Sequence, residues 1–594
     1  MKLKKEKYIC TLIFYMYIIV FFFIDNIFHS GKMNMGISVL IMHLKDGTIK
    51  YTFISFLIIL LIFILIKCIF RDNIKSTIIA TAILVIITTI SYFKFNILKL
   101  PFLPSDVFLI KNIWQITKFG LIFPSLDMCI YFLLIVLNLI VFIINTKKYY
   151  KNEKISFKND WYRILLFIIC CFSIFFLCIE NDRYEKLDIR SDLENSYYWM
   201  NSNSVFFMHI GDLINIPPKE YTEQNIRKIR ENIEEKDIIS NNNRPNVIYI
   251  MNESYMNPNK IKIAEYNINP MEQIEKLQNE DENCKIGKNY SPVIGGGTSL
   301  TEFEALTGLS SYFLNKQIFP YTTHIKSDMN SIVRVFNNNN YKTIGIHTNT
   351  KKFYNRENIY KYLGFSNTIF SEDILNPEYK GGNISDNEFA NQIINQFKQT
   401  NERKFIFGVT MQNHMPYDNK KYEKYNIEVN SRKQDENGKS VLKNYIQGIY
   451  DSNEMFLKIV NFLKNEDQPT ILIMFGDHIP ALPYYYEGYF KVEDFYETPY
   501  IIWSNYNCDL SKVPEMLSPS YLSISILDIC QIDLPWYLKK FKQLYNTYPV
   551  INNEVVMVNN KIVHSNLISD NELINTCRIL QFDLLIKKRY IDIM

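Results

Sequence analysis

A threonine that directly follows three glycines is the first feature of this 594-residue sequence that could do chemistry. Gly295, Gly296 and Gly297 precede Thr298, and the residues after Thr298 show the pattern of a helix. Glycine allows backbone angles and a close ligand approach that side chains forbid. A hydroxyl at a helix start lies where free N–H groups and the helix dipole favour an anion. Thr298 is therefore a candidate nucleophile toward a phosphate, although a simple helix cap after a glycine turn has the same pattern.

Other side chains of metal-binding or acid/base type stand at the ends of predicted strands. In parallel α/β sheets, ligand sites collect just past the carboxyl ends of the strands, so we expect these side chains to meet. Any one of them alone is more often a cap or a surface charge. The set consists of Glu253, His347, His414, Asp477 and His478.

Glutamate, aspartate, histidine and a threonine hydroxyl together make a mainly oxygen-donor site with one imidazole. Such hard donors suit Mn²⁺ or Mg²⁺, with Zn²⁺ as a less favoured alternative. A divalent ion would lower the pKa of the Thr298 hydroxyl and screen the approach of a phosphate anion. The sequence therefore predicts metal-assisted chemistry at a phosphate.

The elements that must position these residues lie after residue 245. Short β-rich runs alternate there with helix-patterned segments, which predicts a layered α/β domain over residues 246–594. Continuous apolar runs suit a parallel sheet covered on both faces. A predicted hairpin at 550–564 and a final helix form a small C-terminal subdomain. Predicted strands are 246–251, 341–347, 404–411, 470–475 and 498–504, and predicted helices are 328–337, 387–399, 441–464 and 520–530.

The first part of the chain reads as a membrane anchor. A helix needs about 20 apolar residues to span the hydrocarbon core. Residues 1–180 contain five such segments, and 98–116, with two prolines, is predicted as an interfacial or re-entrant piece. Residues 181–245 are predicted as an extracytoplasmic linker. The five predicted spans are 8–28, 51–70, 76–92, 126–145 and 161–179.

Lysine distribution predicts the orientation of the anchor. Lysines crowd the N-terminus before the first span and the loop between the fourth and fifth spans. Such positive segments stay on the cytoplasmic side. Five spans that begin inside leave the C-terminal domain outside. The predicted location is the cell membrane, multi-pass, with an extracellular catalytic domain.

Composition excludes several other classes. The net charge is only +4, and no basic stretch interleaves with aromatic residues, so nucleic acid is not a predicted partner. Six of the ten cysteines lie in or beside the apolar runs, and no CxxC occurs, which argues against a disulfide framework or a cysteine zinc site. The Lys/Glu-rich segment 420–439 is predicted as solvated surface.

The chain resembles the lipoteichoic acid synthase family of membrane phosphoglycerol transferases, within the alkaline phosphatase/sulfatase superfamily. The resemblance covers nearly the whole chain and implies a multi-span α-helical membrane domain followed by a sulfatase-like (alkaline phosphatase-like) α/β extracellular domain. It rests on the order of five short motifs: Asn252-Glu253-Ser254, residues 295–299 with Glu302-Phe303, Tyr354-Asn355-Arg356, residues 413–417, and residues 475–478.

The resemblance also implies roles for individual residues. The implied metal ligands are Glu253, Thr298, Asp477 and His478, with Thr298 also the nucleophile. The implied substrate contacts are Arg356, Tyr354, His414 and His347, with His414 also moving protons. Read from the sequence alone, Arg356 could instead form a surface salt bridge on its helix. Tyr354 stands where the family often has tryptophan, and Asn349 stands where it often has aspartate. Residues 479–482 resemble relatives of less certain substrate, which leaves the acceptor open.

The implied reaction transfers glycerol phosphate from phosphatidylglycerol to a hydroxyl, through a phosphothreonine-type covalent intermediate. The acceptor would be a glycolipid, a growing polyglycerolphosphate chain of lipoteichoic acid or a related envelope glycan. A primase-like or glycan-decorating phosphoglycerol transferase and a phosphoethanolamine transferase remain alternatives. A sulfatase activity is disfavoured because no (Cys/Ser)-x-Pro-x-Arg motif occurs. An idle receptor or scaffold is disfavoured because it has no physical reason to keep all four ligands.

Overall fold

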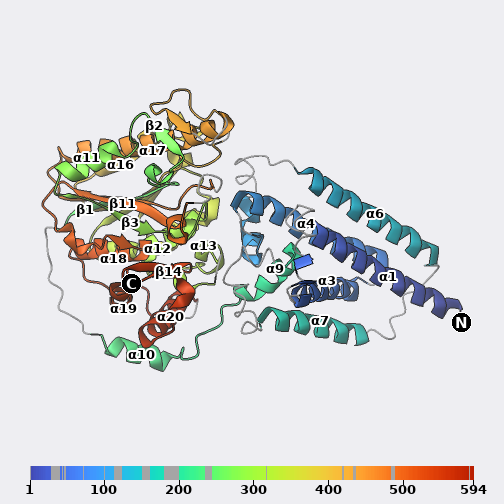
Figure 1. The fold of residues 1–594 in the computed structure, drawn as a ribbon. Helices are drawn as coiled ribbons and strands as arrows, with labels where there is room; N and C mark the ends of the chain where they lie inside the picture. Colours follow the sequence, from blue (N-terminus) through green and yellow to red (C-terminus); the bar gives the residue numbers. More distant parts are fainter. Residues whose placement is uncertain are drawn as a thin grey trace. The chain divides into compact units, whose positions relative to one another are not determined.

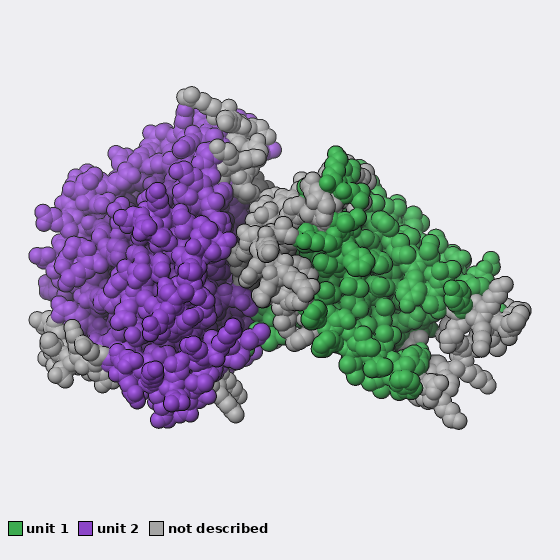
Figure 2. Space-filling view, turned by 60° about the horizontal axis from the view of Figure 1, so that its bottom comes forward, with its two compact units in different colours: residues 1–110, 121–215 green, residues 111–120, 216–594 purple. Residues whose placement is uncertain are grey.

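The computed structural model forms two compact units, residues 1–110 with 121–215, and residues 111–120 with 216–594 (Figure 2). The structure describes residues 2–28, 41–42, 44–45, 49–70, 72–98, 101–112, 124–149, 161–179, 200–233, 244–315, 318–417, 420–431, 436–482, 489–586 and 589–594.

The first unit is built from long apolar helices. Four helical stretches within the described residues are long and apolar enough to cross a membrane, and they coincide with the first four predicted spans. The fifth predicted span coincides with an apolar helix whose described apolar stretch, Trp161–Ile174, is shorter. The expected multi-span helical domain is thus confirmed. Its helices are α1 (Lys2–Ile27), α3 (Ile49–Ile69), α4 (Asn73–Leu98), α6 (Leu126–Tyr149) and α7 (Trp161–Ile179).

Part of the predicted linker belongs to this helical unit. The short helices α9 (Ser202–Met208) and η7 (His209–Leu213) fall within it. Asn203 Nδ2 donates to Asp25 Oδ2 at 3.1 Å and to Thr88 Oγ1 at 3.0 Å, so polar contacts fix α9 on α1 and α4. Helix α10 (Glu223–Glu231) belongs to the second unit. Linker residues 181–199 and 234–243 lie outside the described residues, as do 99–100 and 113–116 of the predicted interfacial piece, whose described part contains η2 (Pro104–Asn112).

An eight-stranded sheet organises the second unit. Its strand order is β12-β3-β11-β10-β1-β8-β4-β5. The strands from β10 to β5 run parallel, as predicted, whereas β11 runs antiparallel to both β10 and β3. The strands are β1 (Asn246–Asn252), β3 (Cys284–Tyr290), β4 (Lys342–His347), β5 (Asn367–Phe370), β8 (Lys404–Val409), β10 (Thr470–Gly476), β11 (Glu497–Ser504) and β12 (Met516–Leu517).

Helices cover both faces of this sheet, as the apolar runs of the central strands require (Figure 1). Every residue of β1 and β10 is buried. On one face lie α11 (Glu272–Glu280), α16 (Asp386–Lys398) and α17 (Glu436–Leu463), and on the other lie α12 (Thr298–Thr307) and α18 (Pro519–Ile529). Further helices are α13 (Pro320–Thr323), α14 (Ile332–Asn338), α15 (Arg356–Leu363), α19 (Trp536–Thr547) and α20 (Glu572–Leu585).

The predicted C-terminal hairpin is present as β13 (Val555–Val558) and β14 (Lys561–His564). Asn559 and Asn560 connect the strands with φ values of 50° and 60°. Two consecutive left-handed residues are what a tight hairpin turn of type I′ demands, and asparagine tolerates them. Smaller antiparallel pairs are β2 (Ala264–Tyr266) with β9 (Val429–Ser431), and β6 (Tyr379–Lys380) with β7 (Asn383–Ile384).

Candidate active site

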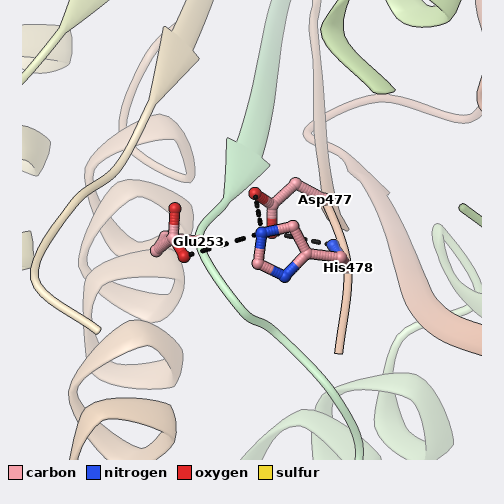
Figure 3. A group of neighbouring side chains, drawn as sticks. All are labelled: Glu253, Asp477 and His478. Atoms are coloured by element: carbon pink, nitrogen blue, oxygen red, sulfur yellow. Dashed lines mark hydrogen bonds and ion pairs between the residues drawn. The ribbon is translucent and has the colours of Figure 1, made fainter. Parts of the chain in front are cut away.

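Two neighbouring strands bring three predicted ligands together. β1 and β10 pair in parallel with Asn252 opposite Gly476, so the residues that follow them, Glu253 and Asp477, emerge side by side. His478 comes next in the chain. One ligand atom from each of Glu253, Asp477 and His478 lies within 4.8 Å of the others, and all three side chains are buried (Figure 3). His478 Nε2 is 3.2 Å from Asp477 Oδ2 and 3.9 Å from Glu253 Oε1.

Hydrogen bonds around the triad orient its ligand atoms. His478 Nδ1 lies 2.9 Å from the main-chain oxygen of Ile479, which only accepts, so Nδ1 carries the proton and Nε2 presents a lone pair. Asp477 Oδ1 accepts the backbone N–H groups of Ser254 and His478, each at 2.8 Å, which leaves Oδ2 directed at the site. Ser254 Oγ donates to Glu253 Oε1 at 2.7 Å. Outer contacts of this kind hold metal ligands in place.

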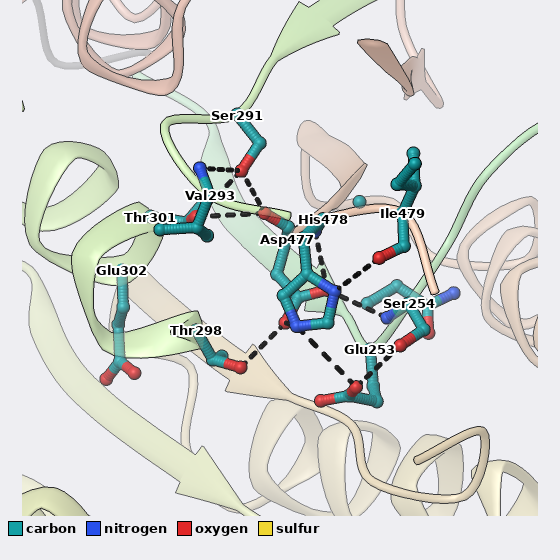
Figure 4. A network of polar contacts seen from close by, with 12 residues as sticks. Glu253, Ser254, Ser291, Val293, Thr298, Thr301, Glu302, Asp477, His478 and Ile479 are labelled. Carbon is teal, nitrogen blue, oxygen red and sulfur yellow. Dashed lines mark hydrogen bonds and ion pairs between the residues drawn. The ribbon is translucent and has the colours of Figure 1, made fainter. Parts of the chain in front are cut away.

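Thr298 reaches the triad from the first position of α12. Gly297 has a φ of 87° and lets the chain turn directly into α12, whose first residue is Thr298. Thr298 Oγ1 donates to Asp477 Oδ2 at 2.9 Å (Figure 4). Thr301 Oγ1 and Ser291 Oγ both donate to the main-chain oxygen of Asp477, the former at 2.9 Å. The predicted helix start is confirmed, and side chains on both sides of the glycine turn bind it to the end of β10.

The electrostatics of the triad fit a divalent cation. Burial raises the pKa of Asp477, and the neighbouring charge of Glu253 raises it further, while His478 and the hydrogen bonds from Ser254 and Thr298 lower it. Two buried carboxylates side by side disfavour each other's ionisation. A divalent cation between them would remove that penalty. The donors, two carboxylates, one imidazole nitrogen and one hydroxyl, are of the type that such ions take.

His414 follows β8 and lies near the triad. His414 Nδ1 is 2.9 Å from the main-chain oxygen of Met415, so this nitrogen donates and Nε2 remains as the acceptor. Burial lowers the pKa of His414, and the charge of Glu253 and the hydrogen bond to Met415 oppose this shift, so burial favours the neutral ring. A neutral imidazole can take a proton and return it.

Lys421 is a residue that the sequence analysis missed. The segment 420–439 was predicted as solvated surface, but Lys421 is only half-exposed and its Nζ donates to the main-chain oxygen of His414. Its ammonium also lies 4.9 Å from the ring centroid of Tyr417. Burial lowers the pKa of Lys421 to about 8, against the charges of Glu253 and Asp386. No sequence pattern separates it from the exposed Lys420 next to it.

Arg356 does not form a surface salt bridge. Its side chain is 1% exposed and pairs with Glu302, which is 0% exposed. Arg356 Nε and Nη2 both donate to Glu302 Oε2, at 3.0 and 2.8 Å. The guanidinium carbon lies 5.2 Å from the ring centroid of Tyr354, which is itself buried. Tyr354 and Asn355 both have positive φ, 53° and 60°, directly before Arg356.

His347 ends β4 and is buried. Its Nδ1 accepts the backbone N–H of Asn349 at 3.2 Å, so the proton sits on Nε2. Burial holds the pKa of His347 well below its usual value, and the charges of Arg356 and His414 lower it further. The structure thus brings the four predicted ligands together. His347 lies close enough to Arg356 and His414 for their charges to lower its pKa.

Residues 245–532 match the Sulfatase family. Together with the sheet and the strand-end site, this match defines residues 245–532 of the second unit as a sulfatase-family domain. The domain follows an N-terminal unit of apolar helices that a membrane would accommodate.

Two curated proteins are similar in sequence to parts of this chain. A putative cyclic beta-1,2-glucan modification protein of Rhizobium meliloti is 29% identical over 58% of this chain and 56% of its own. Lipoteichoic acid synthase 2 of Bacillus subtilis is 24% identical over 39% of this chain and 35% of its own. The chain thus spans about half, or less, of the length of these curated relatives.

A solved structure shows the same fold. The Streptococcus pyogenes phosphoglycerol transferase GacH, in complex with sn-glycerol-1-phosphate, aligns with a TM-score of 0.52 and 22% identity. The alignment covers 63% of this chain and 96% of the GacH chain. The second unit therefore shares its fold with this solved structure.

Proposed function

We propose that this protein transfers glycerol phosphate from phosphatidylglycerol to a hydroxyl acceptor outside the cell membrane, through a glycerophosphoryl-threonine intermediate. The observation that carries the proposal is the 2.9 Å hydrogen bond from Thr298 Oγ1 to Asp477 Oδ2, inside a buried cluster with Glu253 and His478. The likeness of the fold to a phosphoglycerol transferase supports it.

Glu253, Thr298, Asp477 and His478 are the residues that would hold a divalent cation. Mn²⁺ or Mg²⁺ suits this donor set better than Zn²⁺. When bound, the cation supplies positive charge that lowers the pKa of the Thr298 hydroxyl and stabilises the phosphate.

The chain's own groups account for the proton transfers. In the first step Thr298 Oγ1 gives its proton to Asp477 Oδ2 and attacks phosphorus, and the bond from phosphorus to the diacylglycerol oxygen breaks. Before this step His414 Nε2 takes a proton from solvent, and it donates that proton to the departing oxygen. In the second step His414 Nε2 takes the proton of the acceptor hydroxyl, whose oxygen attacks phosphorus. The bond from phosphorus to Thr298 Oγ1 breaks, and Asp477 returns its proton to Oγ1. Throughout, the planar fork of Arg356 would pair with phosphate oxygens.

The substrates follow from the architecture. A domain anchored by apolar helices works where lipid headgroups are concentrated, which suits phosphatidylglycerol as the donor. The acceptor would be a glycolipid, a polyglycerolphosphate chain of lipoteichoic acid or another envelope glycan. The relative described as a putative glucan modification protein favours glycan decoration as the second candidate. A phosphoethanolamine transferase remains a third.

The test is turnover of phosphatidylglycerol in vesicles containing the full-length protein with Mn²⁺. Wild-type protein should release diacylglycerol, and Thr298→Ala should abolish the release. Ser299→Ala is the matched control, because Ser299 neighbours Thr298 on α12 but is buried and not part of the cluster. Full activity of Thr298→Ala would refute the proposal. Products resolved with a glycolipid and with a soluble glucan as acceptors separate the two leading candidates.

A further inference from the structure

Helix α12 carries a second functional group, one turn beyond the nucleophile. Residues four apart lie on the same face of an α-helix, so Glu302 stacks under Thr298. Figure 4 shows both side chains on α12, with Thr298 directed at Asp477. The carboxylate of Glu302 instead meets the guanidinium of Arg356.

We infer that Glu302 is a positioning residue that fixes Arg356 as a phosphate-binding fork at a set distance from Thr298. The inference rests on the proposed function and adds a residue to it. Glu302 occupies Nε and Nη2 of Arg356, both through its Oε2 atom. Among the described residues, the hydrogen bond of Nη1 goes to the main-chain oxygen of Phe353 at 3.5 Å, which is the limit of a hydrogen bond. The Nη1 edge is therefore the part of the fork that is available to a phosphate oxygen.

The backbone before Arg356 supports a positioning role. Two consecutive non-glycine residues in the left-handed region, Tyr354 and Asn355, cost about 1–3 kcal/mol each. Such a turn persists only where contacts around it determine it. Here the buried ring of Tyr354 lies against the guanidinium, and Glu302 holds the guanidinium from the helix side. Helix α12 thus carries Thr298 and, through Glu302, holds the guanidinium of Arg356, so one rigid element sets the positions of both groups.

A buried ion pair is weak evidence for stability alone, because desolvation offsets the attraction of the two charges. A functional readout is therefore needed, and α12 offers a matched control. Glu304 lies on the same helix, is also 0% exposed, and accepts a hydrogen bond from the backbone N–H of Ser311 rather than from an arginine. Glu302→Gln and Glu304→Gln make the same substitution at two buried positions of one helix, and only the first removes a partner of Arg356.

The experiment measures binding of sn-glycerol-1-phosphate and of Mn²⁺ to the full-length protein by calorimetry. Glu302→Gln should weaken glycerol phosphate binding by about tenfold, since hydrogen bonds to charged groups contribute on that scale. Its Mn²⁺ affinity should stay within about twofold, a factor well below the effect of a lost ligand. Glu304→Gln should change neither. Unaltered glycerol phosphate binding by Glu302→Gln would overturn the inference, and so would a parallel loss of Mn²⁺ affinity or no binding by the wild-type protein.

A second pair of variants covers the case in which Glu302→Gln does not fold. In Arg356→Ala, added guanidinium should restore glycerol phosphate binding, because Glu302 can anchor the free cation. The double variant Arg356→Ala/Glu302→Gln buries neither charge, so added guanidinium should not restore its binding of glycerol phosphate. Equal restoration in both would refute the positioning role. If the variants bind sn-glycerol-1-phosphate as expected but the wild-type protein releases no diacylglycerol, only the proposed transfer is refuted. If the wild-type protein releases diacylglycerol but Glu302→Gln binds sn-glycerol-1-phosphate normally, only the role of Glu302 is refuted.

Discussion

At the scale of single residues, Glu253 and Asp477 are buried carboxylates that face the same imidazole nitrogen, His478 Nε2. Burial and the charge of Glu253 raise the pKa of Asp477 in the metal-free protein. The folded protein therefore retains a proton that the unfolded chain loses at lower pH. Its stability must fall as pH rises from the unfolded to the folded pKa of this group.

Asp477→Asn tests this charge arrangement. Without metal, the variant should be more stable than wild type at neutral pH and nearly equal to it in acid, because it lacks the carboxylate that burial penalises. Added Mn²⁺ should raise the Tm of wild type and leave that of the variant unchanged. Thermal unfolding with chelator and with MnCl₂, at acid and neutral pH, measures both effects. Equal stabilisation of the two proteins by Mn²⁺ would contradict the ligand role.

Lys421 is predicted to hold the main chain of His414 in place. Lys421→Met keeps the apolar stem but removes the donor to the His414 oxygen, so turnover should fall by about tenfold, as for loss of a charged hydrogen bond. Because the pKa of Lys421 is lowered to about 8, wild-type activity should decline as pH rises through that value. Lys421→Arg, charged throughout, should not show this decline. Lys420→Met, at the exposed neighbouring position, is the control and should match wild type.

At the scale of elements, the parallel strands and α12 account for most of what the sequence predicted. β1 and β10 are continuous apolar runs, and their ends were located from the polar residue that follows each run. The start of α12 was located from three glycines and a hydroxyl. β3 was missed because Cys284–Tyr290 alternates lysine and apolar residues too weakly to read as a sheet strand. The burial of Arg356 was also missed, since it depends on a carboxylate 54 positions away in the chain.

A buried carboxyl on α12 gives a prediction about this helix. Burial raises the pKa of Glu304 to about 8, although Ser311 bonds oppose the shift. The folded state keeps this carboxyl protonated while the unfolded chain ionises above about pH 4.5, so stability falls by up to about 1.4 kcal/mol per pH unit across that interval. Glu304→Gln cannot ionise. Its stability relative to wild type should therefore increase from pH 5 to about pH 8 in denaturant titrations, and a pH-independent difference would contradict the assignment.

At the scale of the whole molecule, the chain combines a unit of apolar helices with a sulfatase-family domain. The long apolar runs predicted the membrane-type helices, and the alternation of strand and helix patterns predicted the α/β domain, so the class of each unit could be predicted from the sequence. The packing of α9 against α1 and α4 could not be predicted, because it depends on hydrogen bonds from the single side chain of Asn203 to Asp25 and Thr88, and one asparagine gives no periodic pattern in the sequence. The side of the membrane on which the catalytic domain lies remains a prediction from the lysine distribution.

Membrane-impermeant thiol labelling tests that orientation. Lys464→Cys places a thiol at an exposed position of the catalytic unit, and Lys148→Cys places one at the end of α6, beside the lysine-rich loop. In intact cells the reagent should label Lys464→Cys and should reach Lys148→Cys only after permeabilisation, with the parent protein as background. The reverse pattern would place the catalytic domain in the cytoplasm and remove phosphatidylglycerol of the outer leaflet as the donor.

The most direct measurement is peptide mass spectrometry of the Mn²⁺-loaded protein, quenched in acid during turnover of phosphatidylglycerol that carries an isotope-labelled headgroup. The account predicts a labelled glycerophosphoryl group on Thr298, absent from Thr298→Ala and lost when an acceptor hydroxyl is supplied in excess. A label on another residue, or diacylglycerol release by a protein that never becomes labelled, would contradict it.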